Sequence, residues 1–330
     1  MYSDDDLDAA VAAGVMSAET AAAFRAHVAG SRHTPAADEE QFRLITGFND
    51  IFVVIASVLL LASVGWIGAS IRDWFGALTI AAAAWALAEF FVRRRRMALP
   101  AIVLLLAFVG SVFMVSLPLV GEGGSGFGIS GAVAAAAAWL HWLRFRVPIT
   151  VAAGAAAVVG GAVGTLMATV PAAREWLHVA LFAAGLAVFA LALRWDASDV
   201  RRETRRSDVA FWLHLLAAPL MVHPVFTWIG TLAGEETVIA ALLVFALYVA
   251  IALVSLAIDR RALMVSALSY VLYAFSALLQ QTGFVSLGFA LTALVIGSAL
   301  LLLSAFWQKS RAAALGLLPP LARVRLAPLR

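Results

Sequence analysis

The sequence predicts an all-α protein, a polytopic transmembrane helix bundle with about ten spans. Three observations support this prediction: an excess of apolar residues, a series of apolar stretches of span length, and basic residues gathered in alternate loops. Of the 330 residues, 63% are hydrophobic and 13% are charged, whereas a soluble domain has roughly 45–50% apolar and about 25% charged residues. This composition is typical of a chain whose solvent is mainly lipid.

The apolar stretches match the thickness of a bilayer, because a hydrocarbon core of about 30 Å needs roughly 20 helical residues. Ten stretches come close to this length, and the fourth and sixth are the shortest. They cover residues 49–71, 74–92, 99–120, 127–142, 148–170, 176–193, 209–230, 237–258, 263–281 and 284–307. We therefore expect a ten-span membrane domain over residues 49–307.

The basic residues predict the orientation of these spans. With the N-terminus inside, all but two of the 23 basic residues fall in cytoplasmic segments. The exceptions, Arg72 and Arg174, each stand beside an acid, Asp73 or Glu175. Short loops follow the positive-inside rule, so both termini are expected in the cytoplasm, and the arginines there are expected to contact anionic lipids of the bilayer. The high pI is then a topology signal, and no nucleic-acid partner is expected.

Polar segments flank the membrane domain. Residues 1–30 predict a cytoplasmic helical hairpin, in which Gly14 ends the first helix and Ser17 caps the second. Residues 31–48 predict a linker and a juxtamembrane helix. Residues 308–330 predict a basic tail on the inner leaflet, because three prolines interrupt any helix there. The hairpin is too small for an independent domain, so we expect it to dock on the membrane domain, on a cytoplasmic protein partner or on a second copy of itself.

The hairpin also carries a resemblance. Residues 7–21 follow the pattern of an apolar helix, then Gly-apolar-apolar-Ser, then small-acid-x-Ala, and residues 42–48 lead into a first span that contains Gly65, Trp66 and Gly68. In these features the chain resembles a family of bacterial polytopic membrane proteins of unknown function. The resemblance implies a multi-pass protein of the bacterial cytoplasmic (inner) membrane and implies no activity.

Ionisable groups near the bilayer are functional candidates, because each costs roughly 2.5–3.5 kcal/mol at a helix centre. Asn49 and Asp50 open the first span, and Glu89 lies near the cytoplasmic end of the second. These neighbouring helices are antiparallel, so the three groups could form a proton or cation site. The alternative is that Glu89 pairs with Arg93 one turn on, while Asp50 favours a helix N-terminus.

The seventh span contains His214, Pro219, His223 and Pro224. A proline kink frees backbone carbonyls that can line a cavity, and His223 beside it could bind a ligand or relay a proton. A hydrogen bond from histidine to a neighbouring helix is the alternative. The two histidines are nine residues apart, hence on opposite faces of an ideal helix, so no metal site and no other cofactor are predicted.

The ninth span carries the longest polar pattern. At 100° per residue, its polar side chains fall within an arc of about 140°. Such a face can border a hydrated path, or it can bond to other helices. The candidates for a substrate path are Ser266, Ser269, Tyr270, Tyr273, Ser276, Gln280 and Gln281.

The fifth span predicts close helix packing. Gly160 and Gly164 form a small-xxx-small pair, and Ala153, Ala157 and Gly161 form a parallel row. Small residues at this spacing let two helix backbones approach each other. We expect these residues to serve packing and not a ligand.

No enzyme is predicted. The chain has no cysteine, which excludes disulfides and thiolate chemistry, and no nucleophile–base pair, metal-ligand spacing or dinucleotide fingerprint is present. Ten spans divide into two five-span halves of opposite orientation, as in inverted-repeat carriers, and the layout resembles the drug/metabolite transporter superfamily. The sequence therefore favours a small-molecule transporter. The alternative is a non-transporting scaffold or sensor that binds a partner through its hairpin.

Overall fold

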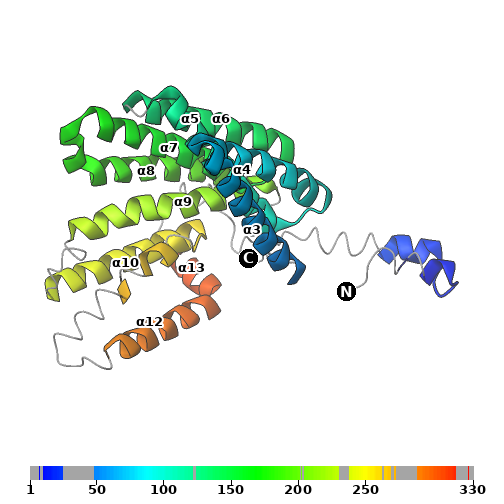
Figure 1. Cartoon of the computed structure of the whole chain (residues 1–330). Coiled ribbons are helices and arrows are strands. Elements are labelled where there is room, and N and C mark those ends of the chain that lie inside the picture. Colours follow the sequence, from blue (N-terminus) through cyan, green and yellow to red (C-terminus); the bar gives the residue numbers. More distant parts are fainter. Residues whose placement is uncertain are drawn as a thin grey trace.

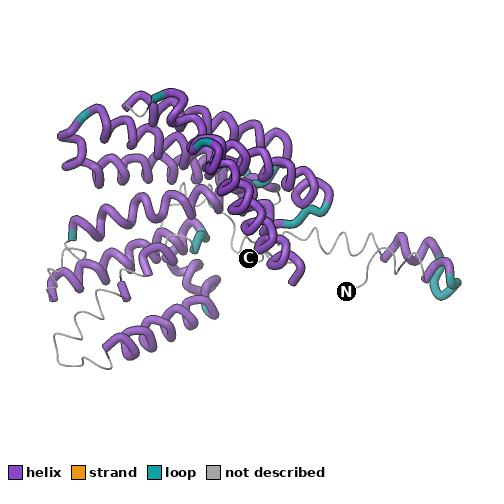
Figure 2. Tube along the Cα trace, viewed as in Figure 1, coloured by secondary structure: helices purple, strands orange, loops and turns teal. Residues whose placement is uncertain are grey.

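The computed structural model is a bundle of long helices (Figures 1 and 2). It describes residues 7, 10–24, 48–121, 124–200, 202, 204–229, 238–261, 264–268, 271–272, 288–316 and 326. These residues are 90% helical and include no strand. From α3 to α9, each helix lies against its neighbour in sequence, as short connections between antiparallel helices require.

The helices follow one another with few intervening residues. The first group consists of α3 (Phe48–Ile71), α4 (Asp73–Ala88), the π-helical turn η2 (Glu89–Arg94), α5 (Ala98–Val120), α6 (Gly124–Phe145) and α7 (Ile149–Thr169). The second group consists of the 3-10 turn η3 (Pro171–Trp176), α8 (Leu177–Ala197), α9 (Arg205–Trp228), α10 (Val238–Ile258), α12 (Gly288–Ala305) and α13 (Trp307–Gly316). Residues 264–268 and 271–272 are also helical.

Among the described residues, seven helices are long and apolar enough to cross a membrane. They are Asn49–Ile71, Asp73–Arg94, Ala98–Val120, Gly124–Phe145, Ile149–Thr169, Pro171–Ala197 and Arg205–Trp228. Large apolar side chains on them remain exposed, including Trp66, Ile67 and Leu119, which fits lipid as the surrounding solvent. The chain is therefore a multi-pass membrane protein. A shorter apolar helix, Leu242–Ile258, lies within α10.

The first seven expected spans overlap these seven helices, and the fourth and sixth differ most in length from the prediction. The fourth was expected over residues 127–142, and α6 covers Gly124–Phe145. The sixth was expected over residues 176–193, and η3 with α8 extends it at both ends. Hydropathy marks only the apolar centre, whereas backbone hydrogen bonding carries a helix on through polar residues such as Arg144 and Asp196.

The C-terminal part contains a helix that is not predicted from the sequence. The helix α13 continues to Gly316 and packs on α10, and a position of residues 308–330 on the membrane surface stays a prediction. Trp307 and Arg311 are buried in this contact. The prolines of the tail follow Gly316 in sequence, so they leave α13 intact.

The N-terminal hairpin shows the expected turns. Gly14 has a φ of +69°, and the N–H groups of Gly14 and Val15 donate to the carbonyls of Val11 and Ala10 at 3.0 Å. The hydroxyl of Ser17 accepts from the N–H of Thr20 at 3.0 Å. A glycine stop and a serine cap are therefore confirmed.

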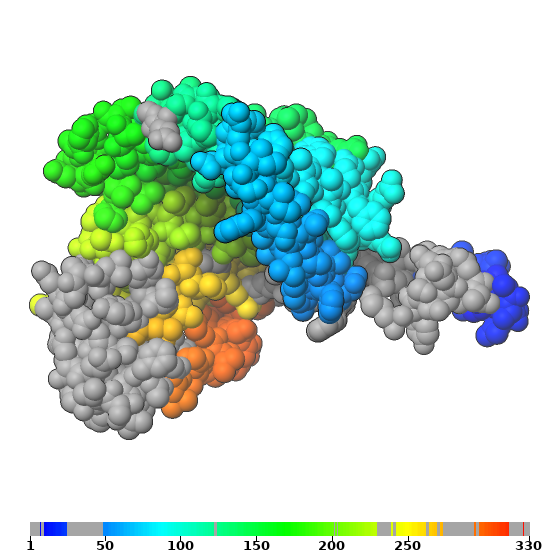
Figure 3. Space-filling model, in the orientation of Figure 1, coloured from blue at the N-terminus to red at the C-terminus, as the bar shows by residue number. Residues whose placement is uncertain are grey.

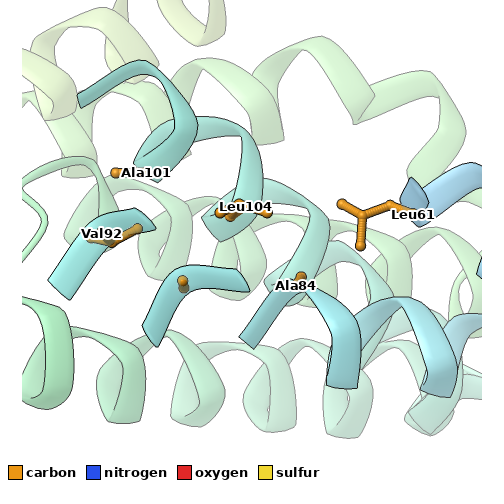
Figure 4. Close-up of a cluster of buried hydrophobic side chains, with 6 residues drawn as sticks. Leu61, Ala84, Val92, Ala101 and Leu104 are labelled. Carbon is orange, nitrogen blue, oxygen red and sulfur yellow. The ribbon is translucent and has the colours of Figure 1, made fainter. Parts of the chain in front are cut away.

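The helices α3, α4, η2 and α5 share an apolar core. Its buried side chains meet at the contact of the three helices shown in Figure 4 and include Leu61, Ala84, Val92, Ala101 and Leu104. Figure 3 shows α3 on the near face of the molecule in this view. The glycines of α3 allow this contact, because a Cβ at Gly68 would lie 2.9 Å from the Cα of Gly76 in α4.

The helices α6 and α7 meet through small residues. A Cβ at Gly131 would lie 2.7 Å from the Cα of Gly161, and Gly154 faces Ala138. Close packing of the fifth span is thus confirmed for the row that contains Gly161. Gly160 differs from the expectation, because nothing lies within 4 Å of a Cβ built there.

Candidate functional site

A buried polar network joins the ends of α8, α9, α10 and α13. We use this name for two connected groups of residues. The first group is Asp196, Ser207, His214 and Arg260, and the second is Arg202, Asp259, Trp307 and Arg311. Charged groups this deeply buried are expensive unless they are paired. The network is therefore the strongest candidate for a functional site in the described part of the chain.

Local structure brings the first group together. Asp196 lies in the last turn of α8, His214 lies in the third turn of α9, and Arg260 lies two residues after the end of α10. Because α8 and α9 pack side by side, residues 18 positions apart come into contact. Side chains on a helix tilt toward its N-terminus, which brings the imidazole of His214 toward the end that carries Asp196.

The carboxylate of Asp196 is the centre of this group. Its Oδ2 lies 2.8 Å from Nε2 of His214 and 3.3 Å from Nε of Arg260. Nη2 of Arg260 donates to Oδ1 of Asp196 and lies 3.3 Å from the carbonyl oxygen of Ser207. The side chains of His214 and Arg260 are fully buried, and that of Asp196 is 17% exposed.

His214 is bonded on one side of its ring. Among the described residues its Nδ1 is buried without a hydrogen-bond partner. When Nε2 donates to Asp196, the neutral ring leaves Nδ1 as an acceptor.

The second group forms hydrogen bonds and ion pairs at the C-terminal end of α10. Asp259 has a φ of 58° and accepts from Nη1 of Arg202 at 3.0 Å and from Nε1 of Trp307 at 2.7 Å. Nη2 of Arg202 donates to the carbonyls of Ile258 and Asp259, both at 3.1 Å. These are carbonyls that the helix leaves unpaired at its C-terminus, where a cation is also favoured by the helix dipole.

A small cavity reaches the network from the end of the bundle that carries the arginines. Its volume is about 30 Å³, and Asp196, Asp199 and Arg202 line it with Ile258. This is enough room for a water molecule with polar partners. Asp196 therefore borders a water-sized space and also contacts His214.

The structure places His223 in the same helix pair. The ring centroids of His223 and His178 of α8 are 6.0 Å apart, and Thr227 Oγ1 donates to the carbonyl of His223 at 2.9 Å. The ring of His214 packs on Phe189 of α8 at 5.2 Å. Both histidines of α9 therefore reach α8, although nine residues place them on opposite faces of an ideal helix.

Glu89 has two arginine partners. Its Oε1 lies 2.7 Å from Nε of Arg144 and its Oε2 lies 2.9 Å from Nη2 of the same residue. Arg93 also contacts Oε2, at 3.3 Å, so the expected pair one turn along the helix is confirmed. Asn49 is exposed and Asp50 is buried. A cation or proton site at these three positions stays a prediction.

The polar face of the ninth span falls mostly outside the described residues. Ser266 is described and half-buried. The other candidates of that face, Ser269, Tyr270, Tyr273, Ser276, Gln280 and Gln281, lie outside the described residues. The substrate path along this span stays a prediction.

Sequence reasoning missed the buried polar network. Asp196 and Asp259 stand beside basic residues at the helix ends, and from the sequence these arginines are explained by orientation alone. An acid placed inside a basic loop is the signal that could have found them, because it offers a partner within reach of a buried arginine.

In the described ranges, no group of three histidine, aspartate or glutamate side chains could hold a metal ion. Comparison of the chain with protein-family models, curated proteins and solved structures gave no match. The function must therefore be argued from the geometry of this chain.

Proposed function

We propose that the chain is a proton-coupled small-molecule transporter of the inverted-repeat type, with ten spans and both termini in the cytoplasm of a bacterial inner membrane. The contact between Asp196 and His214 is the observation that supports this most directly. Asp196 borders a water-sized cavity, and His214 is fully buried behind it. Ionisable residues inside membrane bundles commonly belong to ion pathways and proton relays.

The proposed coupling uses competition for one carboxylate. His214 and Arg260 both bond to Asp196. When His214 takes up a proton at Nδ1, its attraction to Asp196 increases and it competes better with Arg260 for the carboxylate oxygens. These residues belong to α8, α9 and the end of α10, so the protonation state of one histidine acts on the relative positions of three helices, as alternating access requires.

Two further features would belong to the proposed routes of the proton and of the substrate. His178 and His223 lie together on α8 and α9, away from Asp196 along the same helix pair. The polar face of the ninth span is the proposed substrate path. Uptake by sealed vesicles that carry Tyr273→Phe or Gln280→Ala tests this face, and unchanged uptake in both variants would remove it from the mechanism.

Proton coupling is testable in proteoliposomes that contain a pH-sensitive dye. Amino acids, sugars, organic acids and organic cations are added in turn while a pH gradient is imposed. We expect at least one class of compound to move protons with the wild-type protein, and Asp196→Asn and His214→Gln to abolish this flux. His141→Gln is the matched control, because His141 is equally buried but packs against the rings of Trp85 and Phe145.

The proposal fails if no class of compound moves protons with the wild-type protein. It also fails if Asp196→Asn and His214→Gln both retain the wild-type flux. A flux lost equally in His141→Gln would show that any change to a buried histidine inactivates the bundle.

A non-transporting scaffold or sensor is the second candidate, and one observation favours it. Val15 is 79% exposed and Phe24 is 40% exposed on the N-terminal hairpin, so this hairpin offers apolar side chains to a partner or to a second copy. Deletion of residues 1–30 should then remove co-purifying protein or lower the oligomeric state of the purified chain. If the shortened chain inserts and neither property changes, this candidate is excluded.

A further inference from the structure

A cleft with a basic rim opens where η2, α5, α6, α7 and α9 meet. Its volume is about 460 Å³. We call it the basic cleft. Its rim consists of five arginines from three separate stretches of the chain: Arg93, Arg96, Arg144, Arg146 and Arg205.

The rim has a surplus of positive charge. All five arginines are exposed, and Asp208 is the one acidic residue in the lining. Glu89 bonds to Arg144 and Arg93 from outside the lining. The remaining cations converge on one concavity, which concentrates their attraction for an anion. A general excess of arginine in cytoplasmic loops explains their side of the membrane but not this convergence.

The floor of the cleft is apolar. Val92, Met97, Ala101 and Ile149 line it and are buried, and Trp212 is half-buried beside them. A small hydrophilic anion would engage the arginines and leave this floor in contact with water. A ligand that carries both a phosphate and hydrocarbon would cover the rim and the floor together.

Two of the arginines sit in an unfavourable backbone conformation. Arg96 has a φ of 53° and Arg146 a φ of 55°, in the left-handed region that residues other than glycine seldom occupy. Glycine is the usual residue where a helix ends in this way. Here the strained positions carry side chains that line the cleft, which indicates a use for the guanidinium groups.

We propose that the basic cleft binds the phosphate of an anionic phospholipid of the cytoplasmic leaflet, with the first carbons of the lipid on the apolar floor. Guanidinium groups bond to phosphate oxygens in pairs, and basic pockets between membrane helices on the cytoplasmic side suit anionic headgroups. The site is separate from the Asp196–His214 pair, so it does not depend on transport.

The test is native mass spectrometry of the full-length protein in detergent, titrated with phosphatidylglycerol, phosphatidylcholine, glycerol 3-phosphate or inorganic pyrophosphate. We expect tighter binding of phosphatidylglycerol than of phosphatidylcholine. Removal of two guanidinium groups in Arg96→Gly/Arg146→Gly should weaken phosphatidylglycerol binding about thirtyfold. Glycine accepts the backbone conformation at both positions, so the thermal unfolding midpoint should not fall.

Arg94→Gln/Arg95→Gln is the matched control. It removes two positive charges next to Arg96, and neither Arg94 nor Arg95 lines the cleft. Phosphatidylglycerol binding should therefore stay within about twofold of wild type. An equal loss in both double variants would overturn the proposal in favour of unspecific surface attraction. Equal binding of the two lipids, or binding of glycerol 3-phosphate or pyrophosphate without any lipid preference, would overturn it as well.

Discussion

The α6–α7 pair and the junction of α8, α9 and α10 are held by different contacts. In the first, Gly131 and Gly161 let two helix backbones approach until a single added Cβ would collide. In the second, Asp196 joins His214 and Arg260 within buried surroundings. Lipid chains are as apolar as leucine, so helices in a bilayer associate through close packing or through polar contacts. In this chain, close packing joins α6 to α7, and polar contacts join α8, α9 and α10.

The ion pair between η2 and α6 is more exposed than the ion pair at the junction of α8, α9 and α10. The side chains of Glu89 and Arg144 are 32% and 40% exposed, whereas those of Asp196 and Arg260 are 17% and 0% exposed. Exposed pairs contribute little to stability. A buried pair that loses one partner leaves an uncompensated charge. We therefore expect that loss of a charged group lowers stability at the α8–α10 junction, and that an added methyl group lowers stability between α6 and α7.

The largest loss of stability is expected for Arg260→Met. Asp196 would lose its buried arginine partner, and breaking a buried pair in this way costs about 3–5 kcal/mol. Thermal unfolding of the purified protein in detergent should show a large fall of the midpoint. Arg206→Met removes an exposed arginine of the same region and should leave the midpoint close to wild type. Equal midpoints for both variants would mean that the buried polar network does not stabilise the fold.

A smaller effect is expected for Gly161→Ala. Its new methyl group would lie 2.9 Å from the Cα of Gly131 and 3.0 Å from the carbonyl oxygen of Phe127, and overpacking of this kind costs about 1–3 kcal/mol. Gly160→Ala is the matched control, since open space surrounds that position and alanine is the better helix former. Thermal unfolding of both variants measures the difference. A loss at Gly160 as large as that at Gly161 would contradict the packing of α6 on α7.

Arg96→Gly should raise stability by about 1 kcal/mol, because it relieves a left-handed backbone at an exposed residue. Asp259→Gly relieves the same conformation but removes the carboxylate that Arg202 and Trp307 share. We expect the thermal unfolding midpoint to rise in the first variant and to fall in the second. A rise in both variants would mean that the contacts of Asp259 contribute less than the relief of its backbone, and a fall in both would contradict the strain at Arg96.

The smallest effect is expected for Glu89→Gln. The carboxylate lies near the surface between Arg93 and Arg144, where solvent and salt screen the attraction. The thermal unfolding midpoint should stay within the error of the measurement, at low and at high salt. A marked fall that salt does not change would place this pair in the same class as the buried pair of Asp196.

The helices that cross the bilayer could be predicted from the sequence because lipid imposes a length of about 20 apolar residues. The expected span at residues 49–71 and the helix Phe48–Ile71 agree within one residue. The C-terminal end of α6 could not be predicted from hydropathy, since the helix continues through the polar residue Arg144 to Phe145, and Arg144 bonds to Glu89, 55 residues earlier in the chain. The same holds for α13, whose Trp307 is buried through a contact with Asp259, 48 residues earlier in the chain.

The candidate site was predictable only in part. His214 and His223 attract attention as histidines within an apolar stretch, and both face α8. Their partners could not be foreseen, because Asp196 and Arg260 are 64 residues apart and meet only when three helices pack. Gly160 and Gly161 show the same limit, since both are small and only packing decides which of them faces α6.

Single-cysteine labelling tests the ten-span arrangement most directly, because the chain has no cysteine of its own. A membrane-impermeant maleimide is added to spheroplasts that express Thr169→Cys, Ser198→Cys, Thr282→Cys or Ser310→Cys. With both termini in the cytoplasm, Thr169→Cys and Thr282→Cys should react in intact spheroplasts, and Ser198→Cys and Ser310→Cys only after permeabilisation. Reaction of Ser198→Cys in intact spheroplasts, or of Thr282→Cys and Ser310→Cys from the same side, would contradict this arrangement.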